Sequence, residues 1–197
     1  GVLGLVFVPR FDPAVFTSGT YLYADQLARQ VGGPRSLKAL MEEEYRILLH
    51  REGLTSTITV KESTKGVRTL FINGMADASD DRDMATQMLL GHIASLLHPA
   101  PQDAAVIGLA TGVTVGAMSH HPGVRSLDCI EIAPEMADAC RFFDHVIGRI
   151  LDDPRFHLIV QDGRNHMTLT DREYDIIVSE PSNPWISGIA SLFTKEF

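Results

Sequence analysis

The sequence contains little cysteine, few aromatic residues and no long apolar run. Only two of its 197 residues are cysteines, Cys129 and Cys140, and their spacing matches no zinc-binding or disulfide pattern. We therefore expect two buried thiols in a reducing compartment. His120 and His121 are adjacent and lack the spacing that places two imidazoles on one helix face. No metal site is expected.

Positive charge is also scarce, because the formal net charge is −8. This balance argues against nonspecific nucleic-acid binding and is compatible with cationic ligands. The apolar start, residues 1–8, is much shorter than the ~20 residues of a spanning helix, although it is compatible with the end of one. We expect a cytoplasmic domain cut from a longer protein, since the chain lacks an initiating Met and ends inside an expected helix start.

The first third of the chain has the composition of strands. Residues 15–23, 45–51, 56–61 and 68–72 are rich in β-branched and aromatic side chains. Thr64-Lys-Gly66 is typical of a hairpin turn, and residues 37–44 favour a short helix or a loop. The sequence therefore predicts an N-terminal β-rich domain over residues 1–78.

The remainder, residues 79–197, alternates between helix and strand patterns. Apolar residues with helical spacing predict a helix over 83–97, which His98-Pro99 ends. The expected strands are 104–109, 126–132, 157–161 and 174–179, and the expected helices between them are 114–119, 134–146 and 165–169. This alternation predicts a parallel sheet of the α/β class.

The most informative segment follows the first of these parallel strands. Gly108, Ala110 and Gly112 allow the backbone to approach a ligand before a helix begins, and Glu131 ends the next strand. A carboxylate at that place can accept both hydroxyls of a ribose. Small residues also serve tight helix packing without any ligand, so the turn alone leaves both readings open.

Two further signals favour a ligand site. Asp162-Gly163 and the stretch 179–185, Ser-Glu-Pro-Ser-Asn-Pro-Trp, each follow an expected strand. Ligands of open α/β sheets bind at the carboxyl ends of the strands. The sequence thus concentrates polar groups at one sheet edge.

In this order, these residues resemble the polyamine aminopropyltransferases, the spermidine synthase family, and within it the bacterial spermidine-synthase-like proteins that are often fused to membrane segments. The resemblance covers nearly the whole chain and includes residues 152–155, 174–178 and 192–197. It implies a Rossmann-like, doubly wound parallel sheet of the S-adenosylmethionine-dependent methyltransferase type, preceded by a small N-terminal antiparallel β domain.

The resemblance also implies a co-substrate, which is decarboxylated S-adenosylmethionine or S-adenosylmethionine, with no metal. The residues expected to bind it are Gln87, Gly108, Ala110, Thr111, Gly112, Glu131, Ile132, Asp162 and Gly163. Glu131 would bind the ribose and Asp162 the adenine amino group, because carboxylates accept such donors. Asp162 also reads as a plain helix N-cap.

For the acceptor, a polyamine or another amine, the resemblance implies binding by Asp83, Asn183 and Trp185. Glu180 matches the catalytic acid of the family. An alkyl ammonium has a pKa of about 10 and no lone pair for attack, so a carboxylate must hold it and take its proton. Asp83 and Gln87 also fit the polar face of an ordinary amphipathic helix. A homodimer is compatible with the resemblance.

Four positions depart from the family pattern, at Asp77, Thr86, Thr111 and Asn183. Spermidine synthases proper carry an aspartate where this chain has Thr111, and a threonine cannot pair with the aminopropyl ammonium. Two alternatives therefore stay open. One is an S-adenosylmethionine-dependent methyltransferase on the same scaffold, and the other is a non-catalytic domain that senses nucleosides.

Overall fold

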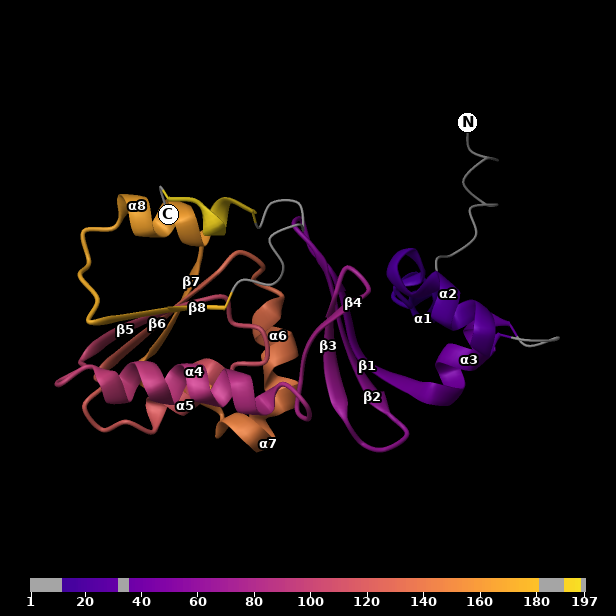
Figure 1. Cartoon of the computed structure of the whole chain (residues 1–197), viewed down its shortest axis with the longest axis horizontal. Coiled ribbons are helices and arrows are strands. Elements are labelled where there is room, and N and C mark those ends of the chain that lie inside the picture. The colour runs from indigo at the N-terminus through magenta and orange to yellow at the C-terminus, as the bar shows by residue number, and fades with distance from the viewer. Residues whose placement is uncertain (1–11, 32–35, 181–189, 196–197) are drawn as a thin grey trace.

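Two sheets lie side by side, and three helices pack at the far end of the first one (Figure 1). The computed structural model describes residues 12–31, 36–180 and 190–195. The elements up to the end of the first sheet are α1 (Pro13–Phe16), α2 (Thr20–Gln30), α3 (Leu37–Glu44), β1 (Tyr45–Glu52), β2 (Thr57–Ser63), β3 (Arg68–Ile72) and β4 (Met75–Ser79).

The first sheet is an antiparallel meander in the order β1-β2-β3-β4, which confirms the predicted antiparallel unit. The predicted hairpin turn is also confirmed. Gly66 has a φ of +81°, and the Ser63 N–H donates to the Val67 carbonyl at 2.8 Å. A positive φ is a conformation that glycine adopts without steric cost.

The predicted strand over residues 15–23 is wrong, because this region forms α1 and α2. Asp12 caps α1 by accepting the Ala14 N–H at 3.0 Å, and Pro13 occupies the first turn. Leu27 of α2 is buried against Leu40 and Met41 of α3. Capping and packing of α2 on α3 therefore outweigh the strand preference of the β-branched and aromatic residues.

One buried cation connects these helices to the sheet. Lys61 of β2 is 2% exposed, and its ammonium donates to the Thr17 carbonyl at 2.5 Å. The Nζ atom also lies 4.3 Å from the centre of the Phe71 ring. Burial disfavours the charged form and lowers the pKa of Lys61 from 10.5 to about 8.

This pKa predicts a stability that rises with pH. Between pH 8 and 10.5 the unfolded chain holds a proton that the folded chain has released. Relative to Lys61→Met, the free energy of unfolding of the wild type should rise by up to roughly 3 kcal/mol across that window. Urea unfolding at a series of pH values measures the difference.

Lys38→Met is the matched control, since Asp12 raises the pKa of the exposed Lys38. The stability that Lys38 contributes is lost as pH rises through its folded-state pKa. The difference in free energy of unfolding between wild type and Lys38→Met should therefore fall as pH rises. A Lys61→Met difference that stays flat from pH 7.5 to 10.5 would contradict the assignment.

The second sheet is parallel, with the order β7-β6-β5-β8. Its elements and those around it are α4 (Met84–Leu97), β5 (Asp103–Ile107), α5 (Val113–Ser119), β6 (Ser126–Glu131), α6 (Met136–Cys140), η2 (Arg141–Phe143), α7 (Asp144–Ile147), η3 (Ile150–Asp152), β7 (Phe156–Val160), α8 (Gly163–Leu169), β8 (Ile176–Ser179) and η4 (Ala190–Phe193). The predicted helix over 134–146 is broken into α6, η2 and α7.

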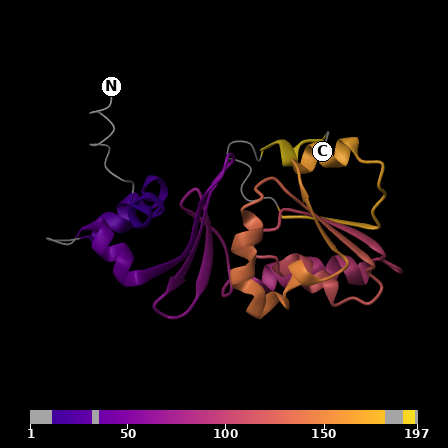
Figure 2. The same cartoon turned by 180° about the vertical axis from the view of Figure 1, so that it is seen from behind.

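Helices cover both faces of this sheet. In Figure 1, α4, α5 and α7 lie on one face and α8 on the other, and Figure 2 shows the same arrangement from behind. The chain steps from β5 outward to β7 and then returns to place β8 on the other side of β5. The strand order therefore reverses between β5 and β8, which is the place where open α/β sheets bind their ligands.

A single hydrophobic core joins the two sheets. Ile58, Val60 and Leu70 of the antiparallel sheet belong to the same buried cluster as Met136 and Phe143 of the parallel unit. The predicted domain boundary at residue 78 falls one residue before the end of β4. The division into two domains stays a prediction.

Within the described ranges, each helix is too short or too polar to cross a membrane. The apolar residues 1–8 of the sequence lie outside these ranges.

Candidate functional site

The turn after β5 adopts left-handed backbone angles, with φ of +92° at Gly108, +46° at Ala110 and +81° at Gly112. A Cβ atom added at Gly112 would lie 2.6 Å from the Cys140 Sγ, whereas one at Gly108 would meet nothing within 4 Å. Gly112 therefore packs tightly against the helices behind it. At Gly108 the backbone borders open space, which a ligand can enter.

Glu131, at the end of β6, is fixed beside this turn. Its Oε2 accepts the Leu109 N–H and its Oε1 accepts the Ala133 N–H, each at 2.9 Å. Burial raises the pKa of this carboxyl and Asp77 adds to the rise, while the backbone N–H groups act in the opposite direction. Each oxygen keeps one further lone pair, so the carboxylate can still accept two hydroxyl donors.

A chain of hydrogen bonds connects α4 to the glycine turn. The Thr111 hydroxyl donates to the Gln87 Oε1 at 2.6 Å, and the Gln87 amide donates to the Asp83 Oδ2 at 2.5 Å. Thr111 is fully buried and Gln87 is 6% exposed. The structure thus brings these three residues together, and the side chains of Thr111 and Gln87 form hydrogen bonds with other protein groups.

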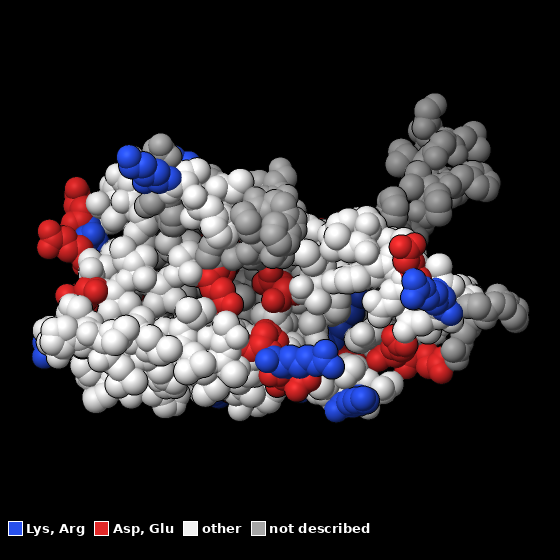
Figure 3. Space-filling view, viewed as in Figure 1, with Lys and Arg blue, Asp and Glu red and all other residues white. Residues whose placement is uncertain are grey.

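Glu180 follows β8 and belongs to a group of acids. Partial burial raises the pKa of the Glu180 carboxyl, and the charges of Asp77 and Asp83 add to the rise. Asp77 of β4 also raises the pKa of Glu131, so it lies within electrostatic reach of both Glu131 and Glu180. Figure 3 shows acidic side chains where the two sheets meet. Such a concentration of negative charge favours a cationic ligand.

Asp162 lies at the end of β7 and caps α8, because its Oδ1 accepts the Asn165 N–H at 2.8 Å. A Cβ atom at Gly163 would lie 2.6 Å from the Ile107 Cγ2, so this glycine lets α8 pack closely on the sheet. Ile132 is 49% exposed beside Glu131. The capping interpretation of Asp162 is confirmed, and its adenine contact stays a prediction.

The sequence analysis missed a buried acid on β6. Asp128 is fully buried, accepts a hydrogen bond from the Tyr174 hydroxyl at 2.8 Å and forms an ion pair with Arg172 at 2.7 Å. The same hydroxyl lies 3.1 Å from His166 of α8. Burial and Asp128 raise the pKa of Tyr174 to about 12. This network ties α8 to the sheet, and an aspartate inside an apolar strand was the available signal.

A cavity of about 350 Å³ lies between α8 and the sheet, and its lining reaches Ser179, the residue before Glu180. Its lining residues are Ile107, Met167, Thr170, Arg172, Tyr174, Ile177 and Ser179. The Ser179 hydroxyl is buried and has no hydrogen-bond partner among the described residues. The cavity therefore lies on the α8 side of the sheet and borders the residues that precede the glycine turn and Glu180.

Two predicted residues, Asn183 and Trp185, lie outside the described residues. Among the residues that the structure does describe, no group of three or more histidine, cysteine, aspartate or glutamate side chains is arranged to hold a metal ion.

The arrangement as a whole offers two kinds of recognition. Open backbone at Gly108 and the free acceptor positions of Glu131 suit a nucleoside with a ribose diol. The acids Asp77, Asp83 and Glu180 suit an ammonium group next to it. The glycine turn follows β5 and Glu180 follows β8, the two strands on either side of the reversal point.

Comparison with protein families finds one match in this region. Residues 83–197 match the family model described as "Spermine/spermidine synthase domain".

Curated proteins similar to this chain include polyamine aminopropyltransferases. The one from Serratia proteamaculans (strain 568) is 30% identical over 132 residues, and the one from Bacillus subtilis (strain 168) is 28% identical over 128 residues. These matches cover 66% and 65% of this chain but only 45% and 46% of the relatives. The chain thus spans about half the length of the curated relatives it matches.

Solved structures with a similar fold include two spermidine synthases. One, in complex with the transition state analogue AdoDATO, has a TM-score of 0.70 and 22% identity, covering 77% of this chain and 52% of that chain. The other, from Thermotoga maritima, has a TM-score of 0.67 and 22% identity, covering 77% and 50%. These likenesses confirm the predicted Rossmann-like fold with its preceding antiparallel sheet.

Proposed function

The chain belongs to the spermine/spermidine synthase domain family, and we propose that it carries the nucleoside site and the catalytic acid of a polyamine aminopropyltransferase. The co-substrate is decarboxylated S-adenosylmethionine, and the acceptor is a polyamine or a related alkyl amine. The observation that carries the proposal is that Glu180 follows β8 and the open glycine turn follows β5, its neighbour in the sheet, while Asp77 and Asp83 raise the pKa of Glu180.

In this proposal, the glycine turn and Glu131 bind the nucleoside. Glu131 is already oriented by two backbone N–H groups, so it accepts the ribose hydroxyls without further ordering. The open side of Gly108 admits the ligand. Asp162 keeps one carboxylate oxygen beyond its cap bond for the adenine amino group.

Asp77, Asp83 and Glu180 act on the acceptor amine. They hold its ammonium by charge, and Glu180 takes the proton that leaves the attacking nitrogen. The nitrogen lone pair forms a bond to the methylene carbon beside the sulfonium, and the carbon–sulfur bond breaks with its electrons on sulfur. The products are neutral methylthioadenosine and the extended amine as a secondary ammonium, which carries the positive charge that the sulfonium loses, so atoms and charge balance.

A methyltransferase is the second candidate, and Thr111 is the observation that favours it. Its hydroxyl is fully buried and bonded to Gln87, so this position offers no carboxylate for an aminopropyl ammonium. The reaction would then transfer methyl from ordinary S-adenosylmethionine.

The proposal also includes a cytoplasmic location and a parent protein that is fused to membrane segments, in addition to the amine acceptor.

Calorimetry and product analysis test the proposal. The chain should bind methylthioadenosine, and with decarboxylated S-adenosylmethionine and putrescine it should release methylthioadenosine. Release of S-adenosylhomocysteine from S-adenosylmethionine would favour the methyltransferase instead. A chain that binds none of these nucleosides would refute both candidates, and one that binds them without turnover would favour the sensing domain.

A further inference from the structure

Asp83 is held from the residue that ends β4. Its Oδ2 accepts the Ser79 N–H at 2.8 Å, and its other oxygen accepts the Ser79 hydroxyl. Gln87 donates to the same carboxylate from one turn further along α4. The position of the Asp83 carboxylate therefore depends on the short β4–α4 connection, residues 79–83.

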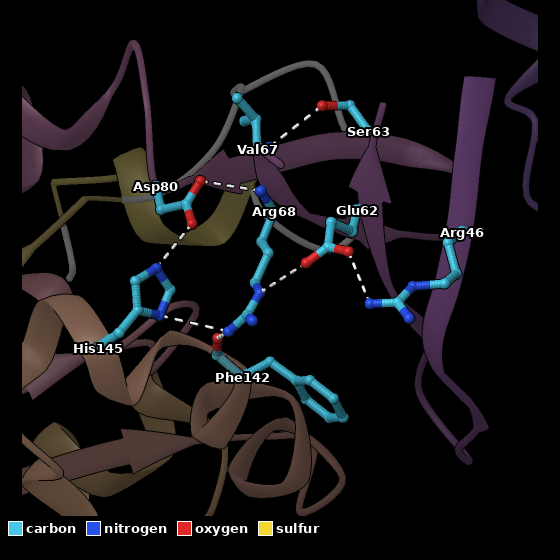
Figure 4. Close-up of polar contacts among 8 residues, drawn as sticks. All are labelled: Arg46, Glu62, Ser63, Val67, Arg68, Asp80, Phe142 and His145. Carbon is cyan, nitrogen blue, oxygen red and sulfur yellow. Dashed lines mark hydrogen bonds and ion pairs between the residues drawn. The ribbon is translucent and has the colours of Figure 1, made fainter. Parts of the chain in front are cut away.

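Asp80, the next residue of this connection, is fixed from two directions (Figure 4). Its Oδ1 accepts the Arg68 N–H at 2.9 Å, and its own N–H donates to the Arg68 carbonyl at 3.1 Å. Its Oδ2 accepts from the His145 Nε2 at 2.9 Å. Asp80 thus joins β3 of the antiparallel sheet to α7 of the parallel unit.

The Arg68 side chain spans the same boundary. Its guanidinium donates to the Phe142 carbonyl at 2.6 Å, contacts the His145 Nδ1 at 3.4 Å and donates to Glu62 at 3.3 Å. Glu62 in turn accepts from Arg46 at 2.7 Å, at the outer end of the network. The Asp80 side chain is only 8% exposed and that of Arg68 33%, so solvent screens these contacts less than those of an isolated surface pair.

We propose that Arg68, together with Asp80 and His145, forms a boundary clamp that positions Asp83 for the ammonium of the acceptor amine. This inference rests on the proposed function, because it assigns Asp83 to the amine. Arg68 touches neither ligand and acts through Asp80 and Ser79. No part of the clamp contacts Glu131 or the glycine turn in the described structure, so its loss should affect the amine and spare the nucleoside.

The test compares Arg68→Gln with Arg51→Gln. Arg51 of β1 also joins the antiparallel sheet to the parallel unit, through an ion pair with Asp138 of α6 at 3.2 Å, and within the described structure it forms no hydrogen bond or ion pair with residues 79–83. Calorimetry of the full chain measures methylthioadenosine binding and then putrescine binding to the nucleoside-loaded protein. Arg68→Gln should weaken putrescine about tenfold, since small displacements of a positioning group reduce ligand recognition strongly. Arg51→Gln should change neither affinity by more than about twofold.

Hydrogen exchange gives a readout that is independent of the proposed function. The Ser79 amide, which donates to Asp83, should exchange faster in Arg68→Gln and unchanged in Arg51→Gln. If Arg68→Gln does not fold, His145→Ala takes its place. The His145 side chain is half-exposed, and its truncation removes the contact with Asp80. The same direction with a smaller effect is then expected.

The outcomes separate the two ideas. A wild-type chain that binds the nucleoside but no diamine overturns the proposed function and the inference built on it. A wild type that binds both, with Arg68→Gln binding putrescine equally well, overturns the clamp alone. Equal loss of nucleoside and diamine in Arg68→Gln also overturns it, since that pattern marks general damage.

Discussion

Replacing Glu180 with glutamine should lower the rate of methylthioadenosine release by on the order of 10² to 10⁴. Glutamine keeps the shape of the side chain but cannot accept the proton of the attacking amine. The affinity for methylthioadenosine should stay within about twofold, because Glu180 lies outside the nucleoside contacts assigned to Glu131 and the glycine turn. Single-turnover kinetics and calorimetry measure the two quantities on the same protein.

Glu173→Gln is the control for the loss of one negative charge. Glu173 is exposed and lies before β8, at the opposite end of the strand from Glu180. Its replacement should leave the rate unchanged. A Glu180→Gln variant with the wild-type rate would remove Glu180 from the reaction, and one that loses the nucleoside would show a binding role instead.

The pH dependence of the wild-type rate should also show that Glu180 acts as the base. Burial, Asp77 and Asp83 raise the Glu180 pKa above its ordinary 4.5, and the base must be ionised to act. The rate should therefore fall as pH decreases through this raised pKa. Asp77→Asn removes one source of the rise and should move the acidic limb to lower pH.

Glu131→Gln is the second change with a large expected effect, on nucleoside affinity. Each carboxylate oxygen of Glu131 accepts one backbone N–H. In glutamine the amide NH2 replaces one of these oxygens, so it faces a backbone N–H donor to donor and leaves fewer acceptors for the ribose. Hydrogen bonds to a charged partner contribute about 1.5–3 kcal/mol each, so loss of two should weaken methylthioadenosine binding by roughly 10²- to 10⁴-fold.

Asp128→Asn serves as the buried control on the same strand. Asp128 is fully buried and bonded to Tyr174 and Arg172, three residues before Glu131. Its replacement should reduce the melting temperature and leave nucleoside affinity nearly unchanged. If both variants lost the nucleoside equally, damage to the sheet and not ribose recognition would explain the result.

The sequence predicted the elements whose local pattern and packing agree. The apolar segments that became β5, β6 and β8 read as strands because both faces of a parallel sheet are buried. β4 was missed, since Met75–Ser79 contains two alanines, an aspartate and a serine and forms a strand only by pairing with β3. The region of α2 was read as a strand because its packing on α3 is tertiary information.

The candidate site was predictable in its chemistry but not in its contacts. Glycines and acids at expected strand ends indicated which residues would gather at one edge. The pairing of Thr111 with Gln87, and of Asp80 with Arg68 and His145, joins residues that are 12 to 65 positions apart. No local periodicity encodes such partners, so the structure was needed to reveal them.

The hydrophobic cluster that runs from Ile58 and Leu70 to Met136 and Phe143 buries the inner face of the antiparallel sheet against the parallel unit. Grafting the N-terminal meander onto a different scaffold would strip its inner side chains of their neighbours and expose them to water. Chimeras of related proteins with a crossover near residue 79 should therefore be less stable than chimeras that take both sheets from the same parent.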